Sequence, residues 1–227
     1  RTTTSIFIFA SGILAALPSY AQVDLGAGLI AYYPFSGNAN DASTNANHGT
    51  VMGAQLTTDR FGAPDAAYLF NGSTDYITVP ASASLDSPDT ALTMSAWVDL
   101  FGTTLTGEAG IDPVLMKSAE ATNAFMYRMD CGPSYVSAGS GSWNNLSGVS
   151  ATLDLQTWYM LTVSMSPDTE RIYINDSLVA ENPYVPQLTA DGRPLEIGRD
   201  MPGYIEHFNG KIDEVRIYDR AISAEEV

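Results

Sequence analysis

The chain has 227 residues, of which 45% are hydrophobic and 16% are charged, and its formal net charge is −16. That length suffices for one sizeable hydrophobic core, and all-β sandwiches often reach it as single domains. The strongly acidic balance argues against nucleic acid and anionic membrane surfaces as partners, because both would repel the chain. Acidity alone does not indicate calcium, because a solvated acidic surface has the same composition.

Residues 1–21 have the form of a secretory signal peptide. Arg1 precedes an apolar run from Ile6 to Leu17, and the pattern at 19–21 matches a cleavage site. The run is shorter than the roughly 20 apolar residues of a membrane span, and no other stretch qualifies as one. We therefore expect a secreted protein, extracellular or at the cell surface, whose mature chain starts at Gln22.

The rest of the chain is a series of short β segments separated by turn residues, without helical periodicity. In the segment 92–100, alternate residues form one apolar face, and the other face is mixed. The segment 158–165 has the same division, which two stacked antiparallel sheets require. The Gly/Ser/Asn-rich stretch 137–147 is predicted as a loop. The predicted strands are Leu29–Phe35, Ala66–Asn71, Tyr76–Val79, Leu92–Leu100, Val114–Lys117, Phe125–Met129, Trp158–Met165, Arg171–Ile174, Leu195–Gly198 and Lys211–Tyr218.

The closing run, residues 209–227, is predicted as a strand, a turn and the first residues of a helix. Strict alternation along the strand puts Asp213 on the same face as Val215 and Ile217. A buried ionised carboxylate is costly unless it is hydrogen-bonded, paired or bound to a metal, so we expect a partner for Asp213. Because the chain starts with Arg and stops at a helix start, we also expect the domain to be cut short at its C-terminus.

An oxygen-rich loop, residues 37–49, follows the first predicted strand. It contains one carboxylate, Asp41, among several Asn, Ser and Thr residues that include Asn38. Calcium takes about 6 to 8 oxygen ligands, and a compact loop of this kind can supply them, although the spacing is not that of an EF-hand. The alternative is a set of Asx turns that satisfy the loop backbone. The residues alone leave both interpretations open.

Five segments are similar, in order, to the laminin-G-like jelly rolls of the concanavalin A-like lectin/glucanase superfamily, in its small bacterial type. They are residues 29–50, which begin LIAYYPFSGNAND, residues 66–80, residues 92–98, residues 157–165, and the closing run from 208 with NGKIDEVRIYDR. The resemblance covers nearly all of the chain after the leader. It implies an all-β fold, a two-sheet antiparallel jelly-roll sandwich, in one domain over residues 22–227.

The resemblance also implies a structural calcium ion near the chain termini, where the first loop approaches the last strand. Asp41 and loop carbonyls such as that of Asn38 would share this ion with Asp213.

A weaker similarity to the pentraxin branch of the superfamily implies a second set of calcium ligands, Asn123, Asp200 and Glu206. The chain departs from that branch at Thr122 and Arg199, where acidic or amide groups are expected. The alternative is a polar surface on which Arg199 pairs with Asp200 or Glu206 for about 0 to 1 kcal/mol.

Sugar recognition uses aromatic rings for stacking and amides or carboxylates to bind hydroxyl groups. Trp143 stands among Gly, Ser and Asn residues and has no strand face to fill, so it is the first candidate. The alternative is a loop plug that folds back onto the core. The other candidates are Asn144 and Asn145 beside it, and Tyr135, Tyr184 and Tyr204.

Catalysis is not expected. Hydrolases of this architecture carry acidic residues at alternating positions on one strand, as E-x-D-x-x-E or E-x-D-x-E, and the chain has no such string. The nearest groupings are Glu108 with Asp112 and Glu196 with Asp200, and their spacing is poor for one strand face. Cys131 has no partnering base pattern that would make it a nucleophile.

The sequence thus predicts a non-catalytic recognition module for an extracellular glycan, with a structural calcium ion. One alternative is an adhesion module that binds a cell-surface or matrix protein. The other is an accessory domain of a larger extracellular enzyme, such as a glycoside hydrolase.

Overall fold

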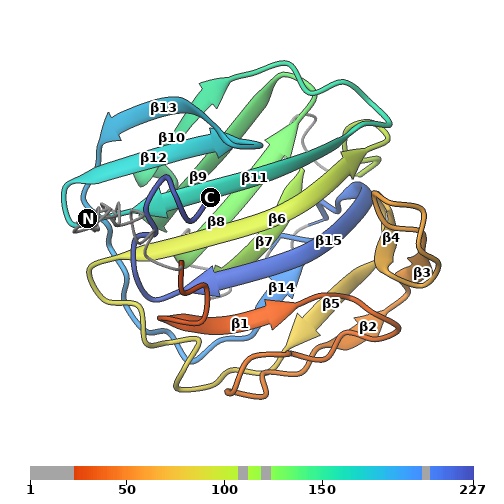
Figure 1. The fold of residues 1–227 in the computed structure, drawn as a ribbon, viewed down its shortest axis with the longest axis horizontal. Helices are drawn as coiled ribbons and strands as arrows, with labels where there is room; N and C mark the ends of the chain where they lie inside the picture. The colour runs from red at the N-terminus through yellow and green to blue at the C-terminus, as the bar shows by residue number, and fades with distance from the viewer. Residues whose placement is uncertain (1–22, 107–111, 119–123, 201–204) are drawn as a thin grey trace, which may run out of the picture.

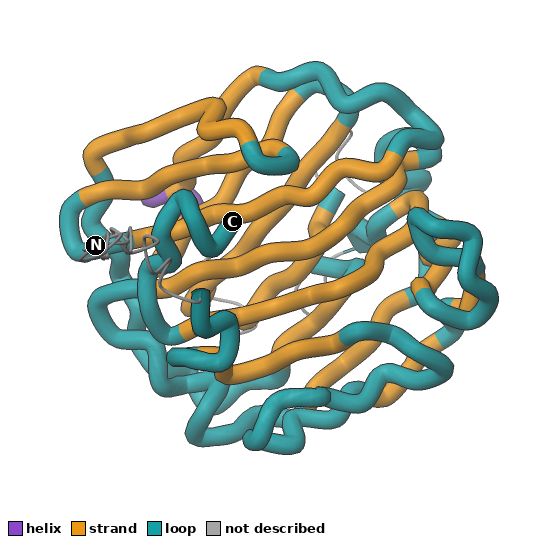
Figure 2. The backbone as a smooth tube through the Cα atoms, in the orientation of Figure 1, coloured by secondary structure: helices purple, strands orange, loops and turns teal. Residues whose placement is uncertain are grey.

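The computed structural model describes residues 23–106, 112–118, 124–200 and 205–227. Within these ranges the chain forms two antiparallel β-sheets stacked face to face, with the eight-stranded sheet in front of the seven-stranded sheet in Figure 1. Figure 2 shows loops gathered around the rim of the two layers. This confirms the predicted all-β, two-sheet jelly-roll sandwich. No helix in the described ranges is long and apolar enough to cross a membrane.

The eight-stranded sheet is organised around β15, which pairs with β6 on one side and with both β1 and β4 on the other. Its strands, in spatial order, are β13 (Ser177–Pro183), β12 (Thr169–Ile174), β11 (Trp158–Met165), β6 (Leu92–Leu100), β15 (Asn209–Tyr218), β4 (Ala67–Asn71) and β3 (Gln55–Thr57), with β1 (Leu29–Tyr33) beside β15.

The seven-stranded sheet lies behind it. A short 3-10 turn, η1 (Trp143–Asn145), joins two of its strands. Its strands, in spatial order, are β10 (Leu146–Ser150), β9 (Tyr135–Ser142), β8 (Ala124–Gly132), β7 (Pro113–Ser118), β14 (Leu195–Ile197), β5 (Tyr76–Val79) and β2 (Thr50–Met52).

The hydrophobic core fills the space between the two sheets. On β6 the core residues are Met94, Ala96 and Val98, and on β11 they are Leu161 and Val163, all without exposed surface. These are the faces that alternation predicted. Because each strand contributes every second side chain, the residues between them lie on the outer face of the eight-stranded sheet.

A β-bulge in β15 changes the predicted orientation of Asp213. The residue opposite Asp213 is Trp97, and the register with β6 then shifts before Arg216, so that one extra residue is accommodated. Glu214 takes a left-handed conformation at φ 53° within this bulge. The prediction that Asp213 shares a face with Val215 was therefore wrong: Val215 is in the core, and Asp213 lies on the outer face with Trp97.

Five strands were not predicted: β2, β3, β9, β10 and β13. The stretch 137–147, predicted as a loop, forms most of β9, all of η1 and the start of β10. Its small residues misled the prediction, because here they permit close packing: a Cβ on Gly139 would lie 2.5 Å from the carbonyl oxygen of Asn145. The helix start predicted at the C-terminus is also wrong, since residues 224–226 form a turn.

Replacing a core leucine tests the core assignment. Leu161→Ala should lower the free energy of unfolding by about 2–5 kcal/mol, because it leaves a cavity in the core between the two sheets. The matched control is Leu178→Ala on β13, whose side chain is 49% exposed, and it should change stability by no more than about 0.5 kcal/mol. Urea unfolding measures both. Equal losses in the two variants would contradict the assignment.

Candidate functional site

The predicted ligands in the first loop are held by hydrogen bonds. Oδ1 of Asp41 accepts the backbone N–H of Tyr32 (2.9 Å) and of Ser43 (2.8 Å). Oδ2 accepts the Ser43 hydroxyl (2.8 Å) and the N–H of Asn47 (2.8 Å). Asn38 accepts a backbone N–H of its own loop at 2.8 Å. Four donors satisfy a carboxylate, so the Asx-turn alternative describes these contacts.

Asp213 has the partner that its burial demands. Its side chain is 2% exposed, and Oδ2 lies 2.8 Å from Nη1 of Arg60, which comes from the loop between β3 and β4. The Arg60 guanidinium lies over the rings of Trp97 (4.6 Å) and Phe61 (4.5 Å). Burial and the neighbouring Glu214 raise the pKa of Asp213 to about 7, although Arg60 lowers it.

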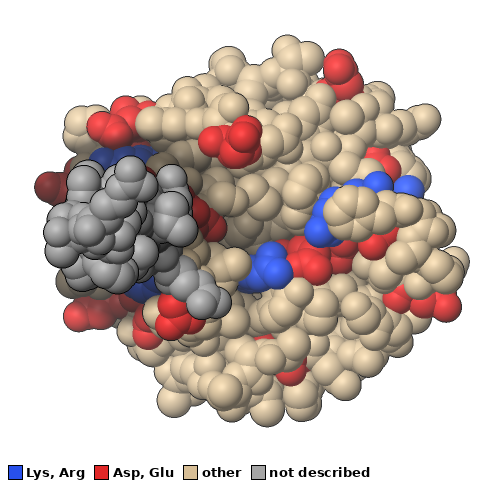
Figure 3. Space-filling view, in the orientation of Figure 1, with Lys and Arg blue, Asp and Glu red and all other residues tan. Residues whose placement is uncertain are grey.

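This ion pair belongs to a charged band on the outer face of the eight-stranded sheet. Lys and Arg side chains alternate with Asp and Glu side chains across the middle of this face in Figure 3. Besides Arg60 and Asp213, the band contains a pair between Lys211 and Asp99 (3.3 Å). The pair of Arg216 with Glu214 (2.5 Å) extends it.

Asn38, Asp41 and Asp213 do not fit a shared calcium ion in this arrangement. The donors around Asp41 and the cation beside Asp213 occupy the oxygens that the ion would need. Over the described ranges, no three His, Cys, Asp or Glu side chains form a group that could hold a metal. Calcium binding itself stays a prediction.

The second predicted set lies at the loop after β14. Asp200 and Glu206 are buried and joined by the backbone, through the N–H of Asp200 and the carbonyl of Glu206 (3.1 Å). Asn123 lies outside the described residues. Arg199 pairs with Glu196 (3.0 Å), which is not one of the two partners predicted for it, and it lies 3.5 Å above the Tyr76 ring.

Asp200 instead lies beside a buried guanidinium that was not predicted from the sequence. Arg128 has no exposed surface, and Nη1 is 3.7 Å from Oδ2 of Asp200. The Arg128 guanidinium also donates hydrogen bonds to both carboxylate oxygens of Asp130, with Nε at 2.6 Å from Oδ2. The two residues are two apart on β8 and share a face, which the alternation of the sequence could have shown. This cluster therefore holds its carboxylates with an arginine.

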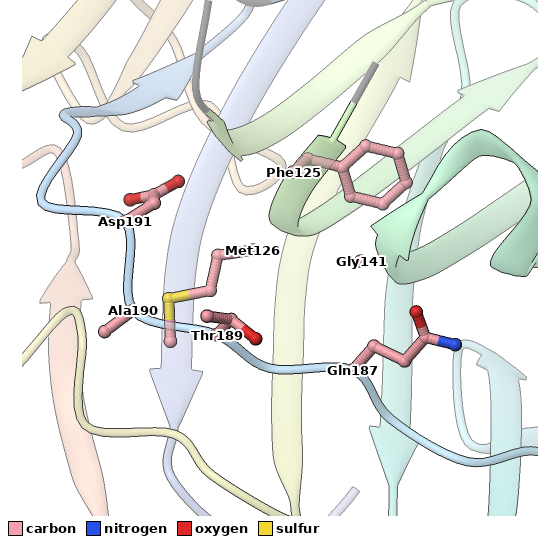
Figure 4. Close-up of a pocket in the computed structure, with 7 residues that line it drawn as sticks. All are labelled: Phe125, Met126, Gly141, Gln187, Thr189, Ala190 and Asp191. Carbon is pink, nitrogen blue, oxygen red and sulfur yellow. The ribbon is translucent and has the colours of Figure 1, made fainter. Parts of the chain in front are cut away.

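A pocket of about 260 Å³ opens where the segment 187–191 crosses the ends of β8 and β9. In Figure 4 the Met126 side chain reaches toward Thr189 and Ala190. A Cβ on Gly141 would lie 2.6 Å from Cβ of Gln187, so only glycine allows this crossing, and its φ of 83° also favours glycine. We call this the Gln187 pocket; it is lined by Phe125, Met126, Gly141, Gln187, Thr189, Ala190 and Asp191.

One wall of the Gln187 pocket carries a net negative charge. Lys117 has no exposed surface, and its Nζ lies 2.5 Å from Oδ1 of both Asp86 and Asp191. One cation between two carboxylates leaves a formal charge of −1. Oδ2 of Asp191 is buried and has no hydrogen-bond partner within the described part of the chain. The wall therefore opposes an anionic ligand more than a neutral one.

The predicted sugar-binding turn lies next to this pocket. η1 begins two residues after Gly141, and Asn144 is exposed there. Asn145 is fixed by donating to the carbonyl of Ser140 (2.9 Å) and to Oη of Tyr184 (3.1 Å). Tyr184 is buried at 7% exposure, so it positions this turn and has little ring surface for stacking. The Trp143 side chain and Tyr204 lie outside what the structure describes.

Sequence reasoning missed the segment that completes the pocket. Gln187, Thr189 and Asp191 come from a stretch without strand periodicity, 184–194, between β13 and β14. The run Thr-Ala-Asp-Gly-Arg at 189–193 is a turn signal and carries no indication of what it packs against.

Residues 71–227 match a family model described as the concanavalin A-like lectin/glucanases superfamily. No curated protein matches the chain by sequence. Among solved structures, domain 4 of AbnA, a GH43 extracellular arabinanase from Geobacillus stearothermophilus solved with arabinotriose, aligns with a TM-score of 0.64. It is 17% identical, and the alignment covers 88% of this chain and 96% of that domain.

The binding domain of botulinum neurotoxin serotype D/C aligns with a TM-score of 0.67 and 12% identity, over 89% of this chain and 51% of that chain. A binding domain of botulinum neurotoxin DC in complex with SialylT aligns with a TM-score of 0.66 and 10% identity, over 89% and 50%. The chain thus spans about half the length of the neurotoxin chains that it matches. At these identities the likeness shows the fold.

The raised pKa of Asp213 predicts a pH dependence of stability. Unfolded aspartate has a pKa of about 3.9, so between about pH 4 and pH 7 the folded state holds the proton more tightly, and stability falls as pH rises. Asp213→Asn removes this titration and should reduce the fall by on the order of 1 kcal/mol, after allowance for solvent screening. Urea unfolding across this range measures it.

The control is Asp176→Asn in the exposed turn between β12 and β13, which should keep the wild-type pH dependence. A wild-type slope in Asp213→Asn would contradict the assignment.

Calcium titration tests separately whether an ion binds at the site predicted near the chain termini, at Asp41 and Asp213. An ion bound there would have to displace Arg60 and the donors around Asp41. We therefore expect Asp41→Asn and Asp213→Asn to keep the wild-type difference in melting temperature between millimolar calcium and excess chelator. A calcium-dependent rise that Asp41→Asn or Asp213→Asn abolishes would instead place the ion where the resemblance put it.

Proposed function

The chain belongs to the concanavalin A-like lectin/glucanases superfamily, and from this we propose that it is a non-catalytic carbohydrate-binding module. Two structures with its fold were solved with ligands, domain 4 of the arabinanase with arabinotriose and the neurotoxin DC binding domain with SialylT. Each of these is one domain of a larger protein, which supports a role as a recognition module.

The Gln187 pocket carries the proposal. Its lining combines an amide, Gln187, a hydroxyl, Thr189, and a carboxylate, Asp191, with apolar surface from Met126 and Phe125. A sugar ring has hydroxyl groups at its edge and C–H groups on its faces, so this mixture matches both. The volume of about 260 Å³ is below the roughly 300–1,000 Å³ of pockets for drug-sized ligands. It therefore suits one ring of a glycan, with the rest of the chain outside.

The charge of the pocket wall favours a neutral sugar. The arrangement of Lys117 between Asp86 and Asp191 leaves one negative charge beside the ligand. A carboxylated sugar would meet like charge there, whereas a neutral sugar would not. The proposed ligand class is a neutral oligosaccharide.

The same arrangement supports binding over hydrolysis. Retaining and inverting glycosidases need two carboxyl groups that flank the scissile bond. Within the described ranges, the pocket carboxylate Asp191 and its neighbour Asp86 both pair with Lys117, so neither is placed to act as an acid or a nucleophile. The predicted signal peptide at 1–21, which lies outside the described residues, supports action outside the cell, as does the extracellular origin of the similar arabinanase domain.

A substitution that fills the pocket tests the function. Thr189→Trp should weaken binding of neutral oligosaccharides by at least about tenfold, because the indole occupies the space of the sugar ring. Gln187→Ala should also weaken binding, but by less, because it removes only hydrogen-bonding groups. A panel of immobilised neutral and acidic glycans identifies the ligand, and titration calorimetry measures its affinity.

The matched control is Thr152→Trp, an exposed position after β10 that does not line the pocket, and it should bind like the wild type. Unchanged affinity and stoichiometry in Thr189→Trp would remove the pocket from the proposal. A wild-type protein that retains no glycan of either charge would overturn the function itself.

A further inference from the structure

A second pocket lies at a corner of the sandwich, where the chain passes between the sheets twice. It goes from β2 of the seven-stranded sheet to β3 of the eight-stranded sheet at Gly53, and it returns from β4 to β5 through residues 72–75. The pocket between these crossings has a volume of about 320 Å³. We call it the corner pocket. At such a corner both layers contribute side chains to one surface.

Three carboxamides from adjacent strands line the corner pocket. Gln55 lies on β3, Asn71 ends β4, and Asn209 begins β15. Asn71 and Asn209 are register partners, so their side chains come from neighbouring strands at the same end of the sheet. A row of amides at the end of a sheet offers donors and acceptors at nearly regular spacing. Hydroxyl groups of a sugar both donate and accept, so they match amides better than charged groups do.

The three amides have different roles. Oδ1 of Asn71 accepts the N–H groups of Ser73 (2.9 Å) and Thr74 (2.9 Å), so Asn71 builds the turn. Nδ2 of Asn209 donates to the carbonyl of Thr103 (3.1 Å), which orients the side chain and leaves Oδ1 without a partner in the described ranges. The Gln55 side chain is exposed and makes no hydrogen bond within the described ranges. Gln55 and Asn209 therefore keep groups for a ligand.

Apolar surface stands beside these amides. The Phe101 side chain lines the pocket and is 39% exposed, and Lys211 lies 5.6 Å from its ring centroid. Leu105 and Ile205 are 69% and 58% exposed, and both lie at this corner. Leu105 borders Gly72, and the Ile205 carbonyl accepts the Thr106 hydroxyl. An exposed aromatic ring next to free amides is the combination that a pyranose ring can use on its face and its edge.

Glycine keeps the pocket open at its other wall. Gly53 has a φ of 90°, and a Cβ there would lie 2.4 Å from Oδ1 of Asp75. Asp75 also lines the pocket, so a side chain at position 53 would push this carboxylate from its place.

From these contacts we infer that the corner pocket is a second carbohydrate site, which takes a neutral sugar with its face on Phe101 and its hydroxyl groups on Gln55 and Asn209. The inference rests on the ligand class of the proposed function and uses no residue of the Gln187 pocket. The module is thus bivalent, and it binds a polysaccharide more tightly than a short oligosaccharide.

Titration calorimetry with a short neutral oligosaccharide counts the sites. The wild type should bind two molecules, and Thr189→Trp should bind one. The variant with Gln55→Ala and Phe101→Ala should also bind one, because both side chains are exposed and the fold tolerates their loss. Retention on an insoluble polysaccharide should fall by about tenfold in each variant, because avidity is lost. The control is Phe61→Ala, 80% exposed and away from both pockets, which should bind two.

The outcomes separate the two proposals. If Thr189→Trp alone abolishes all binding, the corner pocket is overturned and the proposed function stands. If the Gln55 and Phe101 variant alone abolishes all binding, the corner pocket stands and the Gln187 pocket is removed. Wild-type binding by both variants overturns both sites, and the absence of carbohydrate binding in the wild type overturns the function with them.

Discussion

The position of β15 at the centre of the eight-stranded sheet is the constraint on which the rest of the structure depends. One strand holds β6 along one edge and two separate strands, β1 and β4, along the other. The bulge at Glu214 lies between those two partners. It lets Ile212 and Val215 both reach the core, and it moves Asp213 to the outer face under Arg60. One extra residue in β15 therefore allows the same strand to contribute side chains to the core and to the charged band on the outer face.

The acidic protein places most of its few cations in ion pairs. The chain has ten Lys and Arg residues against 26 Asp and Glu residues, and eight of those ten form ion pairs in the described ranges. The most buried, Lys117 and Arg128, each lie near two carboxylates. Removing either would leave buried like charges, which are costly. Burial raises the pKa of Asp112, near the Arg128 cluster, to about 7. Charge pairing therefore restricts which carboxylates can act on a ligand.

Both pockets arise where connections cross the ends of strands, and the core between the sheets stays filled. The Gln187 pocket forms where a segment between the two sheets passes over β8 and β9, and the corner pocket forms where the chain changes sheets. Loops carried by a rigid sandwich can differ in sequence without loss of the core. This explains how structures of 10–17% identity share the fold, and why the fold by itself does not specify the ligand.

The sequence by itself determined the fold class and the apolar faces of β6 and β11, because period-two alternation and turn residues are local signals. It did not reveal the bulge that reversed the face of Asp213, since an extra residue in a ladder depends on the partner strand. Three features join residues that are far apart in the chain: the ion pair of Asp213 with Arg60, the ion pairs of Lys117 with Asp86 and Asp191, and both pockets. Only the tertiary structure decided these, because such contacts are set by strand order and loop paths, which leave no periodic trace in the sequence.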